Sequence, residues 1–334
     1  MLTTLASTGP IEVALARSTE LVPLPSSLPG GCAYELKWDG FRGVLRRTRD
    51  SVELWSRRGV DLGWRFPDVV GAALAQVPAG AVLDGELCVW REARLDWGQL
   101  QRRLGSAAQI AEQVRTSPAS YVAFDVLAVD GVDVRTRPWA ARRALLEQLG
   151  VDWRPPLQLT PVTFDRDEAE QWSRDYRPLG IEGLVAKGAA TRYVPGRASS
   201  WLKWKARATE DVIVGAVTGT VERAQAVIAG RLTPDGQLIV VGRSTVLTAA
   251  QADQLASVLA PVDPARHPWP EQISSLFGGP PVILRHVDPV VVVEVSADAA
   301  LQQGRWRHAV RLVRLRPDLV PADVPPFSMA RGAT

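Results

Sequence analysis

The sequence predicts an α+β protein of two domains, a mixed α/β domain over residues 1–207 followed by a β-barrel domain over residues 208–334. Three observations support this prediction. The 334 residues are 46% hydrophobic and 22% charged, as in a folded chain long enough for two domains. The first part alternates helical and strand patterns. After about residue 206, short β-rich runs follow one another.

Hydrophobic patterning predicts the elements of the first domain. Residues 34–48 and 51–60 form two strands joined by a polar turn at Arg49 and Asp50. Residues 79–90 are expected to form a strand pair around an Asp84-Gly85 turn. Helices are expected at 66–77, 97–114, 137–150 and 168–180, and further strands at 121–131, 181–188 and within 191–206.

The second domain is patterned differently. One helix is expected near residues 248–260, and turn sequences separate the strands. Short strands at this spacing are typical of a small barrel or sandwich. The five predicted β-rich runs are 211–219, 224–232, 237–244, 281–287 and 289–297.

The composition argues against several classes of protein. There is no run of about 18 apolar residues and no signal-peptide pattern, so we expect a cytoplasmic protein without a membrane partner. Cys32 and Cys88 are too few for a disulfide framework or a four-cysteine zinc site. The three histidines lack metal-ligand spacing. The 39 basic residues against 36 acidic ones allow a nucleic-acid partner.

Lysine is rare in this arginine-rich chain. Only an amine can lose its proton and act as a nucleophile, so each lysine marks a candidate site, although chance scatter is the alternative. Lys37 is expected at a strand end, between Glu35 and Arg42, in the string Lys37-Trp38-Asp39-Gly40. The four lysines among the 39 basic residues are Lys37, Lys187, Lys203 and Lys205.

Five further strings follow in order: Ser56-Arg57-Arg58-Gly59, Asp84-Gly85-Glu86, Ala123-Phe124-Asp125, Glu182-Gly183-Leu184-Val185-Ala186-Lys187 and Trp201-Leu202-Lys203-Trp204-Lys205. This series resembles the ordered motifs of the covalent nucleotidyltransferases, which include ATP-dependent DNA ligases, RNA ligases and mRNA capping enzymes. The spacing is most similar to the short two-domain bacterial repair ligases of the ligase C type. The resemblance extends from about residue 20 to about residue 320.

The resemblance implies an ATP-grasp-like adenylyltransferase domain at residues 1–207 and an OB-fold domain at residues 208–334. It implies that Lys37 attacks the α-phosphate of ATP, that the adenylate passes to the 5′-phosphate of nicked duplex DNA, and that the 3′-hydroxyl completes the seal. It also implies ATP as cosubstrate and Mg²⁺ or Mn²⁺ as metal. We expect a monomer that acts in DNA repair, with repair proteins as candidate partners.

The same resemblance assigns roles to other residues. Glu86 and Glu182 would supply carboxylate oxygens, which Mg²⁺ prefers, and Glu86 would also contact ATP. Arg42 and Arg57 would direct their guanidinium forks at ribose and phosphate oxygens. Phe124 would stack on the adenine.

Further roles follow along the chain. Glu35 would contact adenine largely through its backbone. Lys203 and Lys205 alternate across Trp204, so a strand would direct both toward the α-phosphate. There they would stabilise the transition state and favour the neutral, nucleophilic form of Lys37. Lys187 is left as a support or a second phosphate contact.

The C-terminal part carries the last motif in partial form. Arg314, Arg316 and Asp318 match it, but Leu319 stands where the family has a lysine. The match implies contacts to DNA or pyrophosphate. Residues 301–318 carry five arginines against one aspartate, a balance that favours contact with a duplex backbone.

Two other functions stay open at this point. An RNA ligase or a capping-type nucleotidyltransferase uses the same lysine chemistry, and labelling with ATP against GTP would separate these. The second is a non-catalytic OB-type DNA-binding protein. The presence of Lys37, Glu86 and Glu182 together argues against it.

Overall fold

The computed structural model describes residues 9–205, 207–274, 280–298, 301–302 and 305–326. The chain divides into two compact units, residues 1–206 (unit 1) and 207–334 (unit 2). Unit 1 mixes helices with two sheets, as the alternating patterns predict, and unit 2 is mainly strands. None of the helices in the described ranges is long and apolar enough to cross a membrane.

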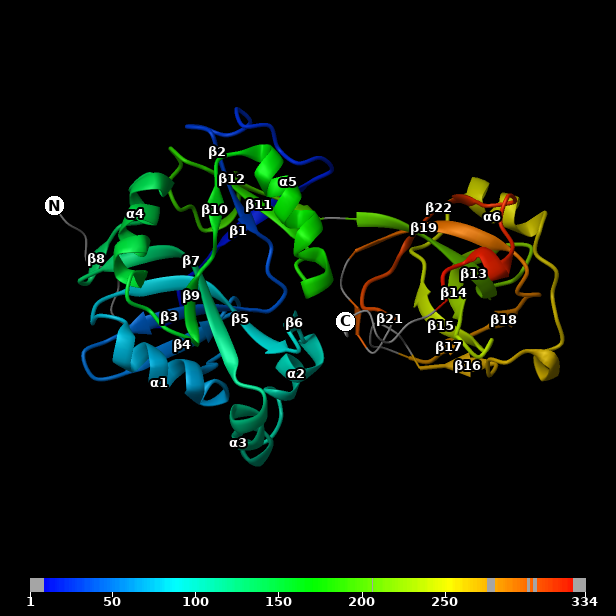
Figure 1. The fold of residues 1–334 in the computed structure, drawn as a ribbon, viewed down its shortest axis with the longest axis horizontal. Helices are drawn as coiled ribbons and strands as arrows, with labels where there is room; N and C mark the ends of the chain where they lie inside the picture. Colours follow the sequence, from blue (N-terminus) through cyan, green and yellow to red (C-terminus); the bar gives the residue numbers. More distant parts are fainter. Residues whose placement is uncertain (1–8, 206, 275–279, 299–300, 303–304, 327–334) are drawn as a thin grey trace. The chain divides into compact units, whose positions relative to one another are not determined.

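The first sheet of unit 1 has the order β4-β3-β5-β7-β8, with β6 on β5 and β9 on β7 (Figure 1). Helix α1 (Pro67–Gln76) packs against it through Val69 and Ala73, because these two residues lie four apart on one helix face. The strands are β3 (Phe41–Arg47), β4 (Val52–Ser56), β5 (Val82–Arg91), β6 (Arg94–Leu95), β7 (Ala119–Val129), β8 (Val132–Asp133) and β9 (Leu157–Leu159).

The second sheet of unit 1 has the order β1-β12-β11-β2-β10. Helix α5 (Arg166–Asp175) lies beside β2 and β11 (Figure 1) and buries Ala169 in a shared core with Tyr34 and Leu184. Helix α4 (Trp139–Gly150) packs on β7 of the first sheet. The strands are β1 (Ala14–Thr19), β2 (Cys32–Leu36), β10 (Val162–Thr163), β11 (Gly183–Gly188) and β12 (Gly196–Lys205).

Sequence predictions for unit 1 are wrong at several points. Residues 34–48 are not one strand, because β2 ends at Leu36 and β3 begins at Phe41 in the other sheet. The Asp84-Gly85 pair is not a turn, because β5 runs unbroken through it. A Cβ at residue 85 would lie 2.5 Å from Cζ of Tyr121, so the glycine serves close packing inside the strand. The single helix predicted at 97–114 is two helices, α2 (Trp97–Arg102) and α3 (Ala107–Thr116). A capping box between Ser106 and Gln109 starts the second one.

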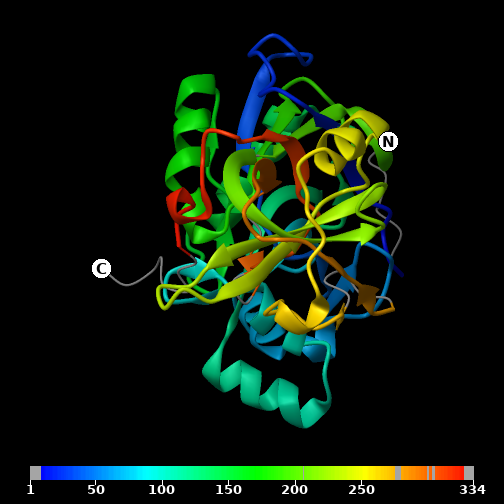
Figure 2. The ribbon, with the colours of Figure 1, turned by 90° about the vertical axis from the view of Figure 1, so that its right-hand side faces the viewer.

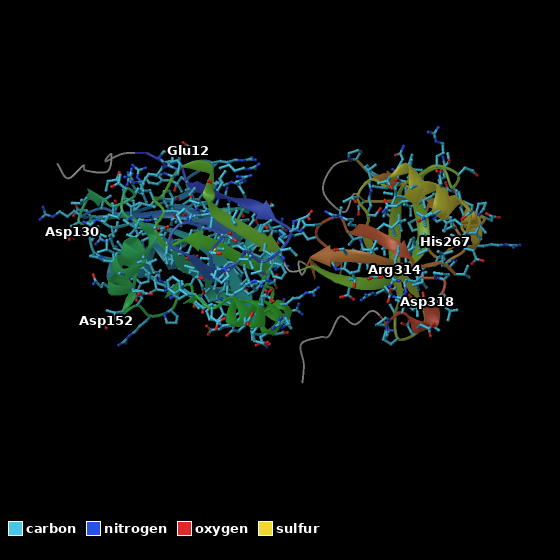
Figure 3. The ribbon with its side chains drawn as sticks, turned by 90° about the horizontal axis from the view of Figure 1, so that it is seen from above. Glu12, Asp130, Asp152, His267, Arg314 and Asp318 are labelled. Atoms are coloured by element: carbon cyan, nitrogen blue, oxygen red, sulfur yellow. The ribbon has the colours of Figure 1, made fainter. Side chains whose placement is uncertain are left out.

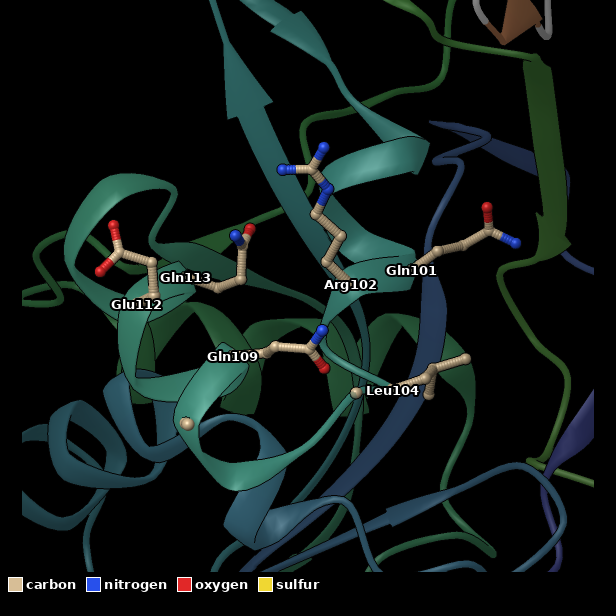
Figure 4. A pocket seen from close by; sticks show the side chains of 8 residues that line it. Gln101, Arg102, Leu104, Gln109, Glu112 and Gln113 are labelled. Carbon is tan, nitrogen blue, oxygen red and sulfur yellow. The ribbon is translucent and has the colours of Figure 1, made fainter.

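Helices α2 and α3 lie at one end of unit 1 (Figures 1 and 2). A cavity of about 700 Å³ opens between them (Figure 4), lined by Gln101, Arg102, Leu104, Gly105, Ala108, Gln109, Glu112 and Gln113. None of the residues predicted to carry the chemistry lines this cavity.

Unit 2 is built on a six-stranded sheet with the order β15-β14-β13-β19-β22 and β18 beside β13. Its strands pair antiparallel, and helix α6 (Ala249–Ala256) contributes Leu255 to the core. The main strands are β13 (Arg207–Gly219), β14 (Ala224–Leu232), β15 (Leu238–Arg243), β18 (Arg285–His286), β19 (Val292–Asp298) and β22 (Arg311–Leu315).

Short elements complete the described chain. Two small hairpins lie in unit 2, and single turns of 3₁₀ helix occur in both units. They are β16 (Gln272–Ile273) with β17 (Val282–Ile283), β20 (Leu301–Gln302) with β21 (Arg305–Trp306), and η1 (Gly63–Arg65), η2 (Arg177–Leu179), η3 (Pro264–Arg266) and η4 (Pro321–Asp323).

Candidate active site

Lys37 follows the last residue of β2, as predicted, and faces the start of β11. Its backbone N–H donates to the carbonyl of Gly183 at 2.8 Å, and its carbonyl accepts from the N–H of Glu182 at 3.0 Å. The Lys37 ammonium forms an ion pair with the Glu182 carboxylate. The Lys37 side chain keeps 19% exposure against 3% for Glu182, so the amine is the accessible partner.

Two more lysines reach the same place along β12. Lys205 pairs with Gly183 and Lys203 with Val185, so both lie on one face of the strand. Lys205 Nζ lies 3.4 Å from Glu182, which therefore contacts two ammonium groups. Burial, together with the charges of Lys37 and Lys205, lowers the pKa of Lys203. The second sheet thus brings Lys37 and Lys205 to one carboxylate and places Lys203 on the same face of β12 as Lys205.

The close packing around Gly40 explains why a glycine stands three residues after Lys37. A Cβ at this position would lie 2.2 Å from the carbonyl oxygen of Leu87 and 2.9 Å from Cγ of Glu86. The glycine therefore lets the chain pass against β5 as it turns from β2 into β3. Arg42 then pairs with Glu86 across the two strands.

Glu86 lies in a setting that favours a cation. Burial raises its pKa to about 7, against the lowering effect of the charges on Arg42 and Lys37. The described residues gather no cluster of three or more His, Cys, Asp or Glu side chains for a metal ion. Mg²⁺, however, is bound by one or two carboxylates together with substrate phosphates, and Glu86 and Glu182 fit that type of site.

Arg42 is held by a carboxylate inside the protein. Its Nε and Nη2 donate to the two oxygens of Asp84, each at 2.5 Å, and Nη2 also donates to the carbonyl of Ala14 at 3.1 Å. Asp84 is fully buried, and the Arg42 guanidinium lies 4.7 Å from the ring centre of Phe124. One edge of the guanidinium fork is therefore fixed by the protein.

Phe124 is 9% exposed and lies next to a buried ion pair. Lys187 and Glu35 are 2.8 Å apart, with side-chain exposures of 1% and 2%. Lys187 Nζ also donates to the Phe124 carbonyl at 2.8 Å and lies 4.2 Å from the ring centre of Trp201. Burial raises the pKa of Glu35 and lowers that of Lys187. The structure places this lysine as an internal support.

The other predicted residues belong to other elements of the chain. Arg57 is exposed in the turn after β4. Arg314 and Asp318, labelled in Figure 3, belong to unit 2 together with Arg316. Arg314 pairs with Glu294 at 2.6 Å. Arg316 lies between two carboxylates, Asp211 at 2.9 Å and Asp318 at 2.8 Å. The hydrogen bond from Arg316 is the main reason why the pKa of Asp318 is lowered to about 2.

Sequence reasoning missed the partners that hold the predicted residues. Asp84 stands in a quoted motif but received no role, and Tyr193, which donates to Asp84 at 2.6 Å, was not singled out. The pairing of Glu35 with Lys187 was also missed. Each of these contacts joins residues far apart in sequence, so no local pattern could have found them.

The site brings together an accessible lysine, a carboxylate, two further lysines, an arginine and an aromatic ring. An amine in such a setting can act as a nucleophile, and the cations can bind phosphate. Comparisons with known proteins agree. A family model described as "ATP dependent DNA ligase domain" matches residues 15–205. The chain belongs to the ATP-dependent DNA ligase family, and it is a ligase enzyme.

Relatives match over nearly the whole chain. DNA ligase C2 of Mycolicibacterium smegmatis is 32% identical and covers 96% of each chain. DNA ligase C of Mycobacterium tuberculosis is 30% identical over 97% of this chain and 95% of its own length. A solved structure, "mycobacterial DNA ligase D complexed with ATP and MES", is 28% identical with a TM-score of 0.52, covering 94% of this chain and 98% of that one.

Proposed function

We propose that this chain seals nicks in duplex DNA by way of an adenylate carried on Lys37. The single observation that carries the proposal is the contact of Lys37 with Glu182. It places an accessible amine where the end of β2 meets the start of β11, beside Lys205 of β12. Membership of the ATP-dependent DNA ligase family supplies the reaction in which such an amine takes part.

The first step joins Lys37 to the nucleotide. The neutral amine attacks the α-phosphorus of ATP, a nitrogen–phosphorus bond forms, and pyrophosphate leaves with its electron pair. Glu182 contacts the ammonium and is placed to accept the proton that it must lose. Lys203 and Lys205 lie on one face of β12, where their charge stabilises the negative charge of the pentavalent phosphorus.

The next two steps use DNA. The 5′-phosphate oxygen at the nick attacks the same phosphorus, which frees Lys37 and leaves AMP on the DNA end. The 3′-hydroxyl then attacks the 5′-phosphate, and AMP leaves with the electron pair while the phosphodiester bond forms. The first step exchanges a phosphoanhydride bond for a phosphoramidate bond, and the second exchanges that bond for a new phosphoanhydride. The third exchanges this phosphoanhydride for the phosphodiester, so no oxidant or reductant is needed.

Other residues of unit 1 bind the nucleotide. Arg42 contacts the ribose and phosphate, Phe124 stacks on the adenine, and the Glu35 backbone contacts the adenine edge. Arg57 lies on an exposed turn, where it can contact phosphates. These assignments rest on the motif matches and on the position of Arg42 and Phe124 4.7 Å apart.

Glu86 and Glu182 would hold Mg²⁺ or Mn²⁺ together with the ATP phosphates. The metal would supply a positive charge that neutralises the phosphates. The raised pKa of Glu86 supports this assignment, because a half-buried carboxylate is stabilised by a nearby cation.

The two units would divide the work. Unit 1 is the adenylyltransferase domain, and unit 2, with its curled antiparallel sheet and helix α6, is an OB-fold domain that contacts DNA. Arg314, Arg316 and Asp318 would contact DNA or pyrophosphate. We further propose a monomer that works in DNA repair with other repair proteins.

The test is covalent labelling with ATP that carries a label on its α-phosphate. The wild type, incubated with Mg²⁺, is expected to keep the label on a denaturing gel and to lose it to sealed product when nicked DNA is added. Lys37→Arg keeps the charge beside Glu182 but forms no adduct. Persistent labelling of Lys37→Arg at the wild-type level, or no labelling of wild type first freed of bound adenylate, contradicts the proposal.

A further inference from the structure

The contacts around Arg42 close into a ring. Asp84 accepts hydrogen bonds from Arg42 Nε and Nη2, and Arg42 Nη2 also donates to the Ala14 carbonyl. The Ala14 N–H donates to the Tyr193 hydroxyl at 3.0 Å, and that hydroxyl donates to Asp84 at 2.6 Å. Four residues from four separate stretches of chain therefore fix one another.

The direction of each hydrogen bond in the ring is settled by chemistry. A backbone N–H can only donate, so the Tyr193 oxygen accepts from Ala14 and its single hydrogen goes to the Asp84 carboxylate. Burial raises the pKa of Tyr193, so the hydroxyl keeps that hydrogen throughout the neutral range. Tyr193 is 4% exposed, and its ring packs edge-on against Trp201 at 5.6 Å.

The ring joins the two sheets of unit 1. Arg42 and Asp84 belong to β3 and β5 of the first sheet, whereas Ala14 belongs to β1 of the second. Tyr193 lies in the loop that leads into β12, the strand that carries Lys203 and Lys205. A residue at this point can hold the arginine in a fixed position relative to the lysines.

The Tyr193 hydroxyl links the Asp84 carboxylate to the backbone of Ala14. Without it, Asp84 keeps Arg42, but its Oδ2 loses one of its two donors and the buried Ala14 N–H loses its acceptor. The guanidinium can then tilt with its carboxylate. Because reacting groups must be held to within a fraction of an ångström, a small tilt costs rate.

We propose that Tyr193 is a positioning residue for adenylate transfer, acting through Asp84 to set the orientation of the Arg42 guanidinium toward the nucleotide. This inference rests on the proposed function. Tyr193 does not touch the nucleotide itself in this scheme, so its effect must pass through Arg42.

A double-mutant cycle on the rate of lysyl-adenylate formation tests this route. Tyr193→Phe keeps the ring packing and removes only the hydroxyl, and it is expected to slow adduct formation about tenfold in the wild-type background. In an Arg42→Lys background, already slowed, the same change is expected to have less than a twofold effect. If the rate loss in the double variant equals the product of the two single-variant losses, the two residues act independently and the proposal is overturned.

Controls separate positioning from loss of folding. Tyr34→Phe removes another fully buried hydroxyl, which donates to the Pro23 carbonyl at 2.7 Å, and it should leave the adduct rate unchanged. If Tyr193→Phe unfolds, Asp84→Asn takes its place in the cycle with the same expected coupling to Arg42. A wild type that forms no adduct contradicts the proposed function, whereas a normal wild type without coupling contradicts only the role of Tyr193.

Discussion

Two lysine–glutamate pairs connect the β2 and β11 regions of unit 1. In one pair the lysine comes from the β2 side, and in the other the glutamate does. Next to β2, Lys37 reaches Glu182 before β11, and within β2, Glu35 reaches Lys187 on β11. They differ in access: the Lys37 side chain is 19% exposed and that of Lys187 1%. The same two groups are thus open to solvent in one place and closed off in the other. On the proposed function, this difference in access separates a reactive lysine from a supporting one.

The surroundings amplify this difference. Glu182 also contacts Lys205, so positive charge accumulates around the accessible amine, where the proposed function requires phosphates to bind. Lys187 instead donates to the Phe124 carbonyl and lies against two aromatic rings. Its amine is fully committed inside the protein and cannot reach a substrate.

The largest expected effect comes from the carboxylate of the accessible pair. Glu182→Gln removes the charge that holds Lys37 and Lys205 and the acceptor for the lysine proton, so adenylate formation should fall about 100-fold. Quenched-flow labelling with ATP measures the rate. Glu53→Gln, which removes a carboxylate paired with Arg46 on the first sheet, is the matched control. Equal rates for the two variants would break the comparison.

The buried pair should control stability instead. Lys187→Met leaves Glu35 buried without its cation, so the free energy of unfolding should fall by about 3 kcal/mol. Urea titration measures it. Adding Glu35→Gln should recover part of the loss, because the uncompensated charge is then gone. If Lys187→Met alone is as stable as the wild type, Lys187 is not an internal support.

A third test uses the pH dependence of stability. The pKa of Glu86 is about 7 in the folded protein and about 4.3 in an unfolded chain, so folding favours its protonated form. That contribution is complete below about pH 4.3 and is lost as the pH rises through 7. Between pH 4.5 and 7.5 the wild type should therefore lose about 3 kcal/mol relative to Glu86→Gln.

The difference between these two proteins is the quantity to measure, because His267 titrates in the same range with the opposite sign. Burial and His286 lower the pKa of His267 to about 4, so its contribution is lost as the pH falls below about 6.5. It is the same in both proteins and cancels. A wild-type profile parallel to that of Glu86→Gln would show that Glu86 is an ordinary carboxyl group.

The smallest effect concerns an ion pair open to solvent. Arg314 is 64% exposed beside Glu294, so Arg314→Gln should leave the unfolding midpoint unchanged. If Arg314 contacts a DNA phosphate, the slope of log K against log salt should drop by about 1. Binding to nicked duplex at several salt concentrations measures it, with Arg285→Gln on β18 as comparison. An unchanged slope removes Arg314 from the DNA interface.

The parts of the site that could be predicted are those that a motif and a strand period specify. Lys37 at a strand end and Lys203 with Lys205 on one face follow from local sequence alone. The family match and the ligase activity are confirmed by the comparisons. The individual roles of the site residues stay predictions.

What could not be predicted depends on contacts across long separations. Tyr193 and Asp84 are 109 residues apart, and only the meeting of two sheets brings them together. The Asp84-Gly85 pair has the composition of a turn, yet it lies inside β5 because the ring of Tyr121 needs the space above Gly85. Such packing requirements outweigh local turn preference.

The most direct test of the central claim is to map the adenylate onto the chain. The protein is incubated with ATP and Mg²⁺, digested, and its peptides are analysed by tandem mass spectrometry. Lys187 is closed off from substrate, and Lys37 is the lysine that the motif match makes the nucleophile, so the adenylate is expected on Lys37 alone. An adenylate on Lys187, or on Lys203 or Lys205 with Lys37 unmodified, would contradict the account.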